Sequence, residues 1–488
     1  MHDAKPSIAQ PQRRSFLKRG GALAGGVVTG ATLSALSAQA ALANGGQRHG
    51  HHGGERHGRR SDYGDLRPTA DRDGDVILAL PKDFAYCTFS KTGEYGDGFI
   101  VPRNHDGMAC FDARGDTVRL IRNHELRNAA GNFDLGVDAP VGLRYDAKGM
   151  GGCITLDFDT RRKRLERQFI GIGGTIVNCS GGWSWKNQGW ITSEETVQGV
   201  NNGYDKPHGY NFLVPAGADR TVAAVPFKAM GRFAHEAAVA DARGIVYQTE
   251  DAGNNSGFYR YLPQRPHDLR TGRLQMLAVK GSPAANLFPS QSVGLRLAVE
   301  WVDVPNPDPA LELGAASCFL QGRTAGGAAF NRLEGIFRGE DGLSMYFLST
   351  SGGTGFGQFW HYLPADGKYQ MEDQLVLVFQ SPNGGILEAP DNLCLTPNGS
   401  ALFCEDDAVN DNDTHPLAPG IANVNRLVGL GPKGEPFEFA VNVLNDSEFA
   451  GACFSPDGEV LFVNLFGDSA PGSGMTCAIW GPWERGPL

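Results

Sequence analysis

Beyond its first 43 residues, the 488-residue sequence has no hydrophobic run near the ~20 apolar residues that a membrane-spanning helix requires. It also has little charge: Asp, Glu, Lys and Arg make up only 20% of the chain, and the net charge is −10. An acidic chain lacks the basic surface that nucleic-acid binding needs. The 41% hydrophobic content excludes a disordered chain, which is poor in apolar residues. We therefore expect a globular protein with no nucleic-acid partner and no stable membrane anchor.

Glycine is abundant, with 67 residues beside 28 Pro and 27 Phe. Each Gly costs ~1 kcal/mol in a helix interior, so this composition argues against a mainly helical fold. Frequent Gly and Pro between apolar runs are typical of short strands joined by tight turns. The composition therefore predicts an all-β protein.

The N-terminal segment has the pattern of an export signal. Residues 12–18 read QRRSFLK, which resembles a twin-arginine signal with Arg13 and Arg14 as the pair. A weakly apolar run follows to residue 42, and small residues at 41–43 suit cleavage. We expect residues 1–43 to be a signal read by the twin-arginine translocase, which places the protein in the periplasm or outside the cell. An uncleaved anchor is the alternative.

Residues 44–74 are predicted to be a linker. Four of the twelve His lie within 44–61 in a Gly- and Arg-rich background, which is typical of a flexible, solvated segment. Weak metal scavenging by these His is the alternative. The remaining chain, 75–488, is expected to form one domain.

A turn followed by a strand recurs six times within that domain. Each copy has a polar turn with Gly, a short apolar strand, and acidic or amide residues at the strand end. Asn-Gly and Asp-Gly between apolar runs are strong hairpin signals. The turn glycines are Gly115, Gly189, Gly244, Gly342, Gly399 and Gly458.

The strand before each turn begins with polar residues, among them Asn104–Asp106, Asn178–Cys179 and His235–Glu236. In an antiparallel hairpin, the start of one strand lies beside the end of the next, so each hairpin brings two polar clusters together. Six such units arranged radially form a six-bladed β-propeller. We expect a partly helical insertion within residues 262–330, with the helix around 311–330.

The open ends of these hairpins are acidic. Crowded carboxylates repel one another unless cations compensate them, and oxygen ligands of this kind suit Ca²⁺. No twelve-residue EF-hand loop is present, so separate blades would supply the ligands. The expected converging acids are Glu125, Glu194, Glu195, Glu236, Glu250, Asp251, Glu334, Asp391, Glu405, Asp406 and Glu448.

Cys179 is the exception among these strand starts. A thiolate among carboxylates favours a softer or redox-active metal such as Fe or Zn, whereas a buried structural Cys is the alternative. Nine Cys is an odd number for an exported chain, so at least one is unpaired or bound to metal. Cys394 and Cys404 flank one turn, and we expect two separate thiols there rather than a disulfide.

Arg332 lies two residues before Glu334, so in an extended strand both side chains point to the same side. Its guanidinium suits a phosphate oxyanion, and an ion pair with a neighbouring acid is the alternative. Other motifs are weaker. Residues 352–355 resemble a phosphate-binding loop without the helix or Lys that completes one, and Ser351 with His361 forms no convincing nucleophile pair.

At these residues the chain resembles the PhoX-type alkaline phosphatases. The matching segments follow one another through most of the chain: NHE (123–125), GGTIVNCSGGWSWKNQGWITSEE (173–195), GRFAHEA (231–237), TEDAGNNSGFYRYLP (249–263), WVDVPNPDP (301–309), RLEG (332–335), DNLCLTPNGSALFCEDD (391–407) and EFAGACFSPDGEVLFVNL (448–465). The runs after Cys179 and before Glu195 depart from the usual family pattern.

The resemblance implies a six-bladed propeller whose centre contains Fe³⁺ and Ca²⁺. By this likeness Cys179 binds Fe, Glu236 and Glu334 are further Fe or bridging ligands, and Arg332 contacts the substrate phosphate. The implied Ca²⁺ ligands are Glu195, Glu250, Asp391, Asn392, Glu405 and Glu448.

The expected function is hydrolysis of small phosphate monoesters by an exported, monomeric, metal-dependent phosphatase. One alternative is another Ca²⁺-dependent propeller hydrolase, such as a phosphodiesterase, phytase or lactonase. The other is a non-catalytic Ca²⁺-stabilised propeller that displays binding loops.

Overall fold

The structure is a computed structural model that describes residues 62–367, 370–406 and 413–488. The expected signal at 1–43 and most of the expected linker lie outside these residues. Antiparallel sheets dominate the described chain, and its one α-helix, α2 (Cys318–Thr324), has seven residues. No helix in the described ranges combines the length and hydropathy needed to cross a membrane.

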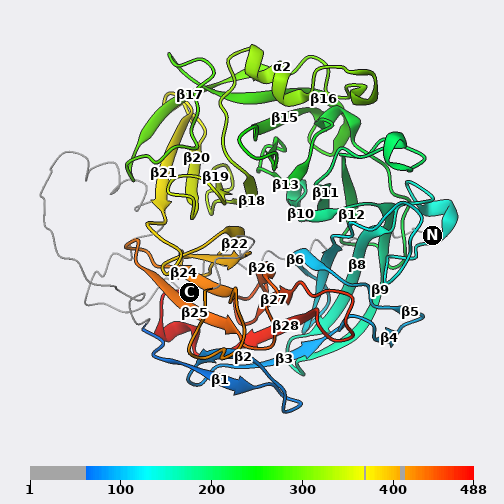
Figure 1. Ribbon diagram of the computed structural model, residues 1–488, viewed down its shortest axis with the longest axis vertical. Helices are drawn as coiled ribbons and strands as arrows, with labels where there is room; N and C mark the ends of the chain where they lie inside the picture. The colour runs from blue at the N-terminus through cyan, green and yellow to red at the C-terminus, as the bar shows by residue number, and fades with distance from the viewer. Residues whose placement is uncertain (1–61, 368–369, 407–412) are drawn as a thin grey trace, which may run out of the picture.

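Six antiparallel units surround a common centre (Figure 1). Each innermost strand contacts the next one around the ring, and the last contacts the first, so the ring is closed. The all-β propeller is confirmed, and these units are compatible with the six expected blades. The innermost strands are β6 (His105–Asp112), β10 (Asn178–Trp183), β13 (His235–Ala240), β18 (Leu333–Arg338), β22 (Pro390–Leu395) and β26 (Phe449–Phe454).

The outer strands follow each inner strand in sequence order. They are β7 (Thr117–His124), β8 (Gly151–Asp159), β9 (Arg164–Thr175), β11 (Gly189–Glu194), β12 (Asn211–Pro215), β14 (Val246–Glu250), β15 (Phe258–Arg265), β16 (Asp268–Val279), β19 (Met345–Ser349), β20 (Gln358–Leu363), β21 (Gln374–Gln380), β23 (Ala401–Glu405), β24 (Arg426–Leu430), β25 (Pro436–Asn442), β27 (Leu461–Leu465) and β28 (Met475–Trp480).

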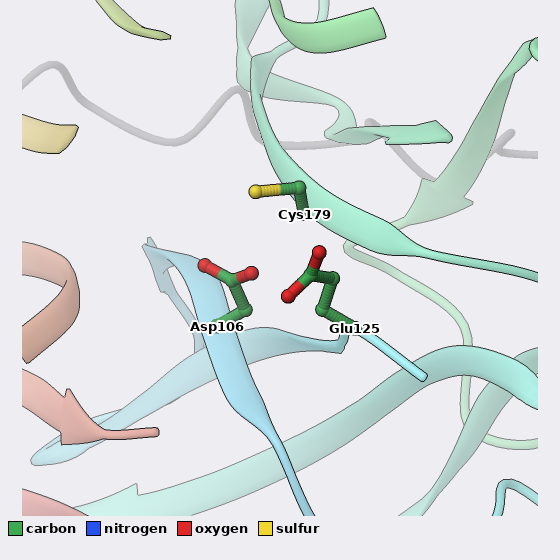
Figure 2. Close-up of side chains that lie close together, drawn as sticks. All are labelled: Asp106, Glu125 and Cys179. Carbon is green, nitrogen blue, oxygen red and sulfur yellow. The ribbon is translucent and has the colours of Figure 1, made fainter. Parts of the chain in front are cut away.

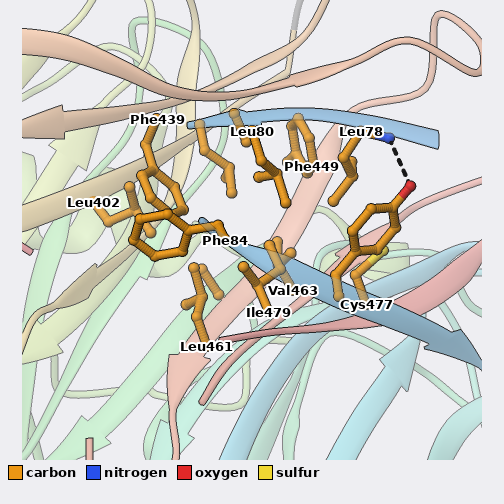
Figure 3. Packing of buried hydrophobic residues seen from close by; sticks show 14 of the residues in the cluster. Leu78, Leu80, Phe84, Leu402, Phe439, Phe449, Leu461, Val463, Cys477 and Ile479 are labelled. Carbon is orange, nitrogen blue, oxygen red and sulfur yellow. Dashed lines mark hydrogen bonds between the residues drawn. The ribbon is translucent and has the colours of Figure 1, made fainter. Parts of the chain in front are cut away.

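The two ends of the described chain close the ring. Strand β3 (Ala85–Phe89) pairs with β28 and completes the last unit. Beside it, Phe84 meets Phe439 edge to face with ring centroids 5.2 Å apart, and the Leu78 amide donates to the Tyr86 hydroxyl at 3.2 Å (Figure 3). Burial of these aromatic and aliphatic side chains joins segments that lie far apart in the sequence.

One strand begins earlier than the expected domain. β1 (Leu66–Ala70) lies inside the expected linker, yet it pairs with β2 (Val76–Pro81), and β2 pairs with β25. The short pair β4 (Tyr95–Gly96) and β5 (Phe99–Ile100) lies before the first inner strand. The hydrogen bonds to β2 pair the backbone groups of β1, which explains why this polar segment forms a strand.

The insertion contains more strand than helix. Strand β17 (Arg296–Asp303) pairs with β16 on one side and β21 on the other, so it joins two neighbouring units into one sheet. The expected helix is present in shorter form as α2, which packs beside β16 at the outer edge of the ring (Figure 1).

Five of the six turn glycines have positive φ, as their turns require. Gly189 instead is the first residue of β11, and the left-handed positions of that turn are Lys186 (φ 57°) and Asn187 (φ 54°). Strand packing explains the glycine there, because a Cβ at Gly189 would lie 2.4 Å from the Val214 carbonyl oxygen.

Candidate metal centre

The first set of candidate metal ligands lies at the second residue of the inner strands. In five strands it is Asp106, Cys179, Glu236, Glu334 or Asp391, whereas β26 has Ala450. The pairing of each inner strand with its neighbour is irregular at or directly after this position. Such irregularities re-aim side chains, which explains how consecutive blades direct comparable positions at one centre.

Small residues beside these positions let the inner strands approach closely. A Cβ on Gly107 would lie 2.5 Å from the Cα of Ser180, and one on Gly451 would lie 2.6 Å from the Asp106 carbonyl oxygen. No side chain is tolerated at these distances. The two glycines therefore bring the strand starts together.

A second set of acids follows the neighbouring strands. Glu125, Glu195, Asp251 and Asp406 each come directly after the strand that pairs with an inner strand. The antiparallel register brings them to the same end as the inner-strand starts, as the sequence predicts.

Seven of these side chains form three overlapping groups, within each of which the potential ligand atoms lie no more than 4.8 Å apart. Cys179 belongs to the first and second groups, and Glu236 belongs to the second and third. Figure 2 shows the first group, in which the Cys179 thiol points toward the carboxylates of Asp106 and Glu125. The groups are Asp106–Glu125–Cys179, Cys179–Glu195–Glu236 and Glu236–Glu334–Asp391.

The electrostatics of this cluster are unfavourable without added positive charge. Burial, followed by repulsion from Asp391 and Glu195, raises the pKa of Glu236 well above its usual value. Burial and nearby carboxylates also raise the pKa of the Cys179 thiol. Neither Glu236 oxygen has a hydrogen-bond partner within the described residues, although both are buried.

These observations fit bound metal ions. Buried, unpartnered carboxylate oxygens are costly unless a cation compensates them. Carboxylates are hard ligands that suit Ca²⁺, and a thiolate adds affinity for a softer metal such as iron. The donor set can therefore hold adjacent cations that share Cys179 and Glu236.

Two arginines border the cluster from opposite ends. Arg127 pairs with both Glu125 and Glu195, and 59% of its side chain is exposed. Arg332 Nε lies 3.2 Å from Asp251 Oδ2, and its Nη2 lies 3.3 Å from Glu334 Oε1. Both guanidinium groups combine carboxylate contacts with exposure to solvent, so both are able to meet an anion.

The backbone of Arg332 is strained. Its φ of 46° lies in the left-handed region that non-glycine residues rarely adopt. Two hydrogen bonds hold it there: its amide donates to the Gly253 carbonyl at 2.9 Å, and its carbonyl accepts from the Thr350 amide at 3.0 Å. Strain maintained in this way is typical of functional sites.

In two pairs of adjacent acids, the first member binds a side chain of its own blade. Glu250 accepts from the Tyr259 hydroxyl at 2.5 Å, and Glu405 forms an ion pair with Arg426 at 2.7 Å. These two expected Ca²⁺ ligands thus have protein partners and lie outside the three groups, whereas Asp251 contacts Arg332.

Glu448 and Asn392 lie next to the cluster. Burial and the neighbouring acids Asp406 and Asp106 raise the pKa of Glu448 well above its usual value. Asn392 donates to Asp391 at 2.7 Å and accepts from the Gly451 amide at 3.0 Å, so it links two blades.

Three residues of the site were not among the expected ligands or phosphate contacts. Asp106 and Glu125 were expected at a strand start and a strand end, respectively, and the structure adds them to the Cys179 group. Arg127 was missed. The available signal was its spacing of two residues from Glu125, the same separation as between Arg332 and Glu334.

All nine Cys lie in the described residues, and all are buried and free. The expectation of two separate thiols at Cys394 and Cys404 is therefore confirmed.

The comparisons with known proteins agree with this fold. A sequence model of the family described as alkaline phosphatase PhoX matches residues 61–468. The structure of Pseudomonas fluorescens PhoX in complex with vanadate, a transition state analogue, has a TM-score of 0.60 at 16% identity, covering 87% of this chain and 98% of that one.

Other similarities are weaker. A gluconolactonase from Xanthomonas campestris has a TM-score of 0.37 at 10% identity over 87% of this chain and 97% of its own, too low to support a conclusion. No curated protein sequence matches. The match over most of the chain confirms the resemblance, and this protein belongs to the PhoX family of alkaline phosphatases.

Proposed function

We propose that this protein is an exported, metal-dependent phosphatase that releases inorganic phosphate from phosphate monoesters. Its family membership supports phosphatase activity. The observation that carries the metal dependence is the line of three overlapping donor groups, in which Cys179 and Glu236 are each shared.

In this proposal the centre binds Fe³⁺ and Ca²⁺. The single thiol favours iron at Cys179, and the carboxylates favour Ca²⁺ elsewhere. Glu250 and Glu405 support the centre indirectly, because their carboxylates bind Tyr259 and Arg426. The proposed Fe³⁺ ligands are Cys179, Glu236 and Glu334, and the proposed Ca²⁺ ligands are Glu195, Asp391, Asn392 and Glu448, with Asp106 and Glu125 as additional metal ligands.

Arg332 binds the phosphate of the substrate. Its planar guanidinium matches two phosphate oxygens, and its strained backbone keeps the side chain at the edge of the cluster. Arg127 adds positive charge at the other end. Metal ions bound between them would neutralise and polarise the phosphate ester. No Ser or Cys nucleophile is required.

The export proposal rests on residues 12–18 and the small residues at 41–43, which precede the described chain. Export through the twin-arginine translocase would deliver a folded protein. Replacing Arg13 and Arg14 with Lys should retain the protein in the cytoplasm, as fractionation of expressing cells would show.

Metal analysis combined with substrate profiling tests the function. The purified protein should contain both iron and calcium, and it should hydrolyse p-nitrophenyl phosphate faster than bis(p-nitrophenyl) phosphate or a sugar lactone. Faster cleavage of the diester or the lactone would replace the monoesterase with one of the other hydrolases. Calcium without iron, together with no hydrolysis of any of the three, would indicate a binding module.

A further inference from the structure

A cavity lies at the end of the inner strands opposite the metal-centre residues. The metal-centre residues lie at the strand starts, whereas this cavity is lined by the ends of β10, β18, β22 and β26 and by the turns that follow them. The six residues of β10 span about 17 Å, which separates the two ends of the ring. The intervening channel contains only about 30 Å³ of free space.

The cavity has the size and lining of a ligand site. Its volume is about 950 Å³, near the upper end of the range for small-molecule pockets. Four of the six inner strands each contribute one half-buried apolar side chain to its floor. These are Trp183, Phe337, Leu395 and Phe454.

The aromatic part of the floor is held in place by its own contacts. The Trp183 and Phe337 rings meet edge to face with centroids 4.8 Å apart. Phe454 packs against Trp483 in the same manner at 5.1 Å. A planar ring entering the cavity would meet preformed aromatic surfaces rather than mobile side chains.

Charge distinguishes this cavity from the rest of the chain. Lys186 and Arg338 line it beside a single acid, Glu340, so its local charge is positive in a protein of net charge −10. The Arg338 guanidinium lies 5.9 Å from the centroid of the Trp183 ring.

The basic edge is also preformed. Arg338 donates to the Ala240 carbonyl at 2.8 Å and to Asn187 Oδ1 at 2.9 Å. Lys186 and Asn187 both have positive φ. They lie in the turn before β11, for which the sequence predicted Gly189 as the turn glycine. The turn thereby holds Arg338 while Lys186 stays exposed.

We propose that this cavity binds a small organic anion that combines an aromatic or other planar ring with a phosphate, sulfonate or carboxylate group. The ring packs on Trp183 and Phe454, and the anionic group meets Arg338 and Lys186. This site is separate from the proposed phosphatase centre and does not depend on its metals.

The probe is 8-anilinonaphthalene-1-sulfonate, which carries an aromatic ring system and one sulfonate. Its fluorescence is titrated with the full-length, metal-loaded protein, and the variants below distinguish this cavity from the metal centre. N-phenyl-1-naphthylamine, which has the same rings without the sulfonate, measures the apolar contribution. We expect saturable binding of the sulfonate and clearly weaker binding of the neutral compound.

Two variants test the charge, and one serves as a matched control. Arg338→Met should weaken sulfonate binding about tenfold, since it removes a charged hydrogen-bond donor. Lys186→Glu, at an exposed position that tolerates the change, should weaken it about threefold. Arg220→Met removes an exposed arginine outside the cavity and should leave binding unchanged.

Hydrolysis of p-nitrophenyl phosphate should be unchanged in all three variants, which separates this test from that of the phosphatase proposal. Three results would overturn the inference: no binding to the wild type, equal affinity for the neutral compound, or wild-type affinity in both Lys186→Glu and Arg338→Met.

Discussion

Arg332 Nη2 lies 3.3 Å from Glu334 Oε1, with Arg332 in a left-handed conformation directly before β18 and Glu334 inside that strand. The pair places a permanent cation against a buried carboxylate of the proposed metal centre. Asp251, from the preceding unit, contacts the same guanidinium at 3.2 Å. The guanidinium that is proposed to bind the phosphate therefore also contacts a proposed metal ligand.

Arg332→Ala should lower kcat/KM for p-nitrophenyl phosphate by about 100-fold or more, because a charged donor to the phosphate is lost. The variant should remain folded by circular dichroism, since the side chain is partly exposed. Arg332→Lys, which keeps the charge without the planar fork, should recover only part of the activity. Wild-type kinetics in Arg332→Ala would remove this residue from the mechanism.

Cys179→Ser should remove iron from the purified protein and nearly abolish phosphatase activity. The thiol is the one soft donor in the three groups, and the hydroxyl that replaces it is a poor iron ligand. Iron content and visible absorbance measure the change. Cys318→Ala, a buried thiol in another part of the fold, is the control and should retain iron. Unchanged iron and absorbance in Cys179→Ser would contradict the assignment.

Metal removal should make stability depend on pH. Burial and repulsion from Asp406 raise the pKa of Asp391 to about 7, and burial together with nearby carboxylates also raises the pKa values of Glu236 and Glu334. Carboxyl groups with raised pKa values bind more protons in the folded state. The free energy of unfolding of the metal-free protein should therefore fall as the pH rises from about 4 through about 7.

The measurement is the Tm of chelator-treated protein at pH 5 and pH 8. We expect a lower Tm at pH 8, and added Ca²⁺ with Fe³⁺ should raise the Tm at pH 8 more than at pH 5. A metal-free protein that is more stable at pH 8 than at pH 5 would argue against a repulsive carboxylate cluster.

The protein should lose the stabilising contribution of protonated His208 as the pH rises into the alkaline range. Burial lowers its pKa, but Glu194 at 2.6 Å and Asp146 at 3.6 Å outweigh burial and raise it to about 9. The cation is therefore retained in the folded state above its unfolded pKa of 6.5. This contribution to stability is complete below about pH 6.5 and is lost as the pH rises through about 9.

His208→Gln should remove that alkaline loss of stability. It should also lower the Tm at pH 7, because two buried carboxylates lose their cation. Thermal melts between pH 6 and pH 10 compare the variant with the wild type. Parallel Tm curves for the two proteins above pH 7 would show that His208 does not carry the effect.

The repeated turns and strands were sufficient to predict the propeller, because glycine turns and alternating apolar strands are local properties. They did not predict β17, which joins two units, or β1, which lies in a polar segment. Both strands are determined by hydrogen-bond partners that come from distant parts of the chain.

The acidic pairs at the strand ends show the same limit. The sequence places Glu250 beside Asp251 and Glu405 beside Asp406, but it does not say which member of each pair faces the centre. Neighbouring side chains on an extended strand point in opposite directions, so the choice depends on register. In the structure Glu250 and Glu405 bind Tyr259 and Arg426.

The sequence by itself determined the fold class, the family pattern and the gathering of acids around Cys179. Each of these follows from residues close together in the chain or from the antiparallel geometry of a hairpin. Only the tertiary structure decided the sharing of Cys179 and Glu236 between groups, the position of Arg127 and the cavity at the opposite end. These features depend on distances between blades, which arise only when the ring closes.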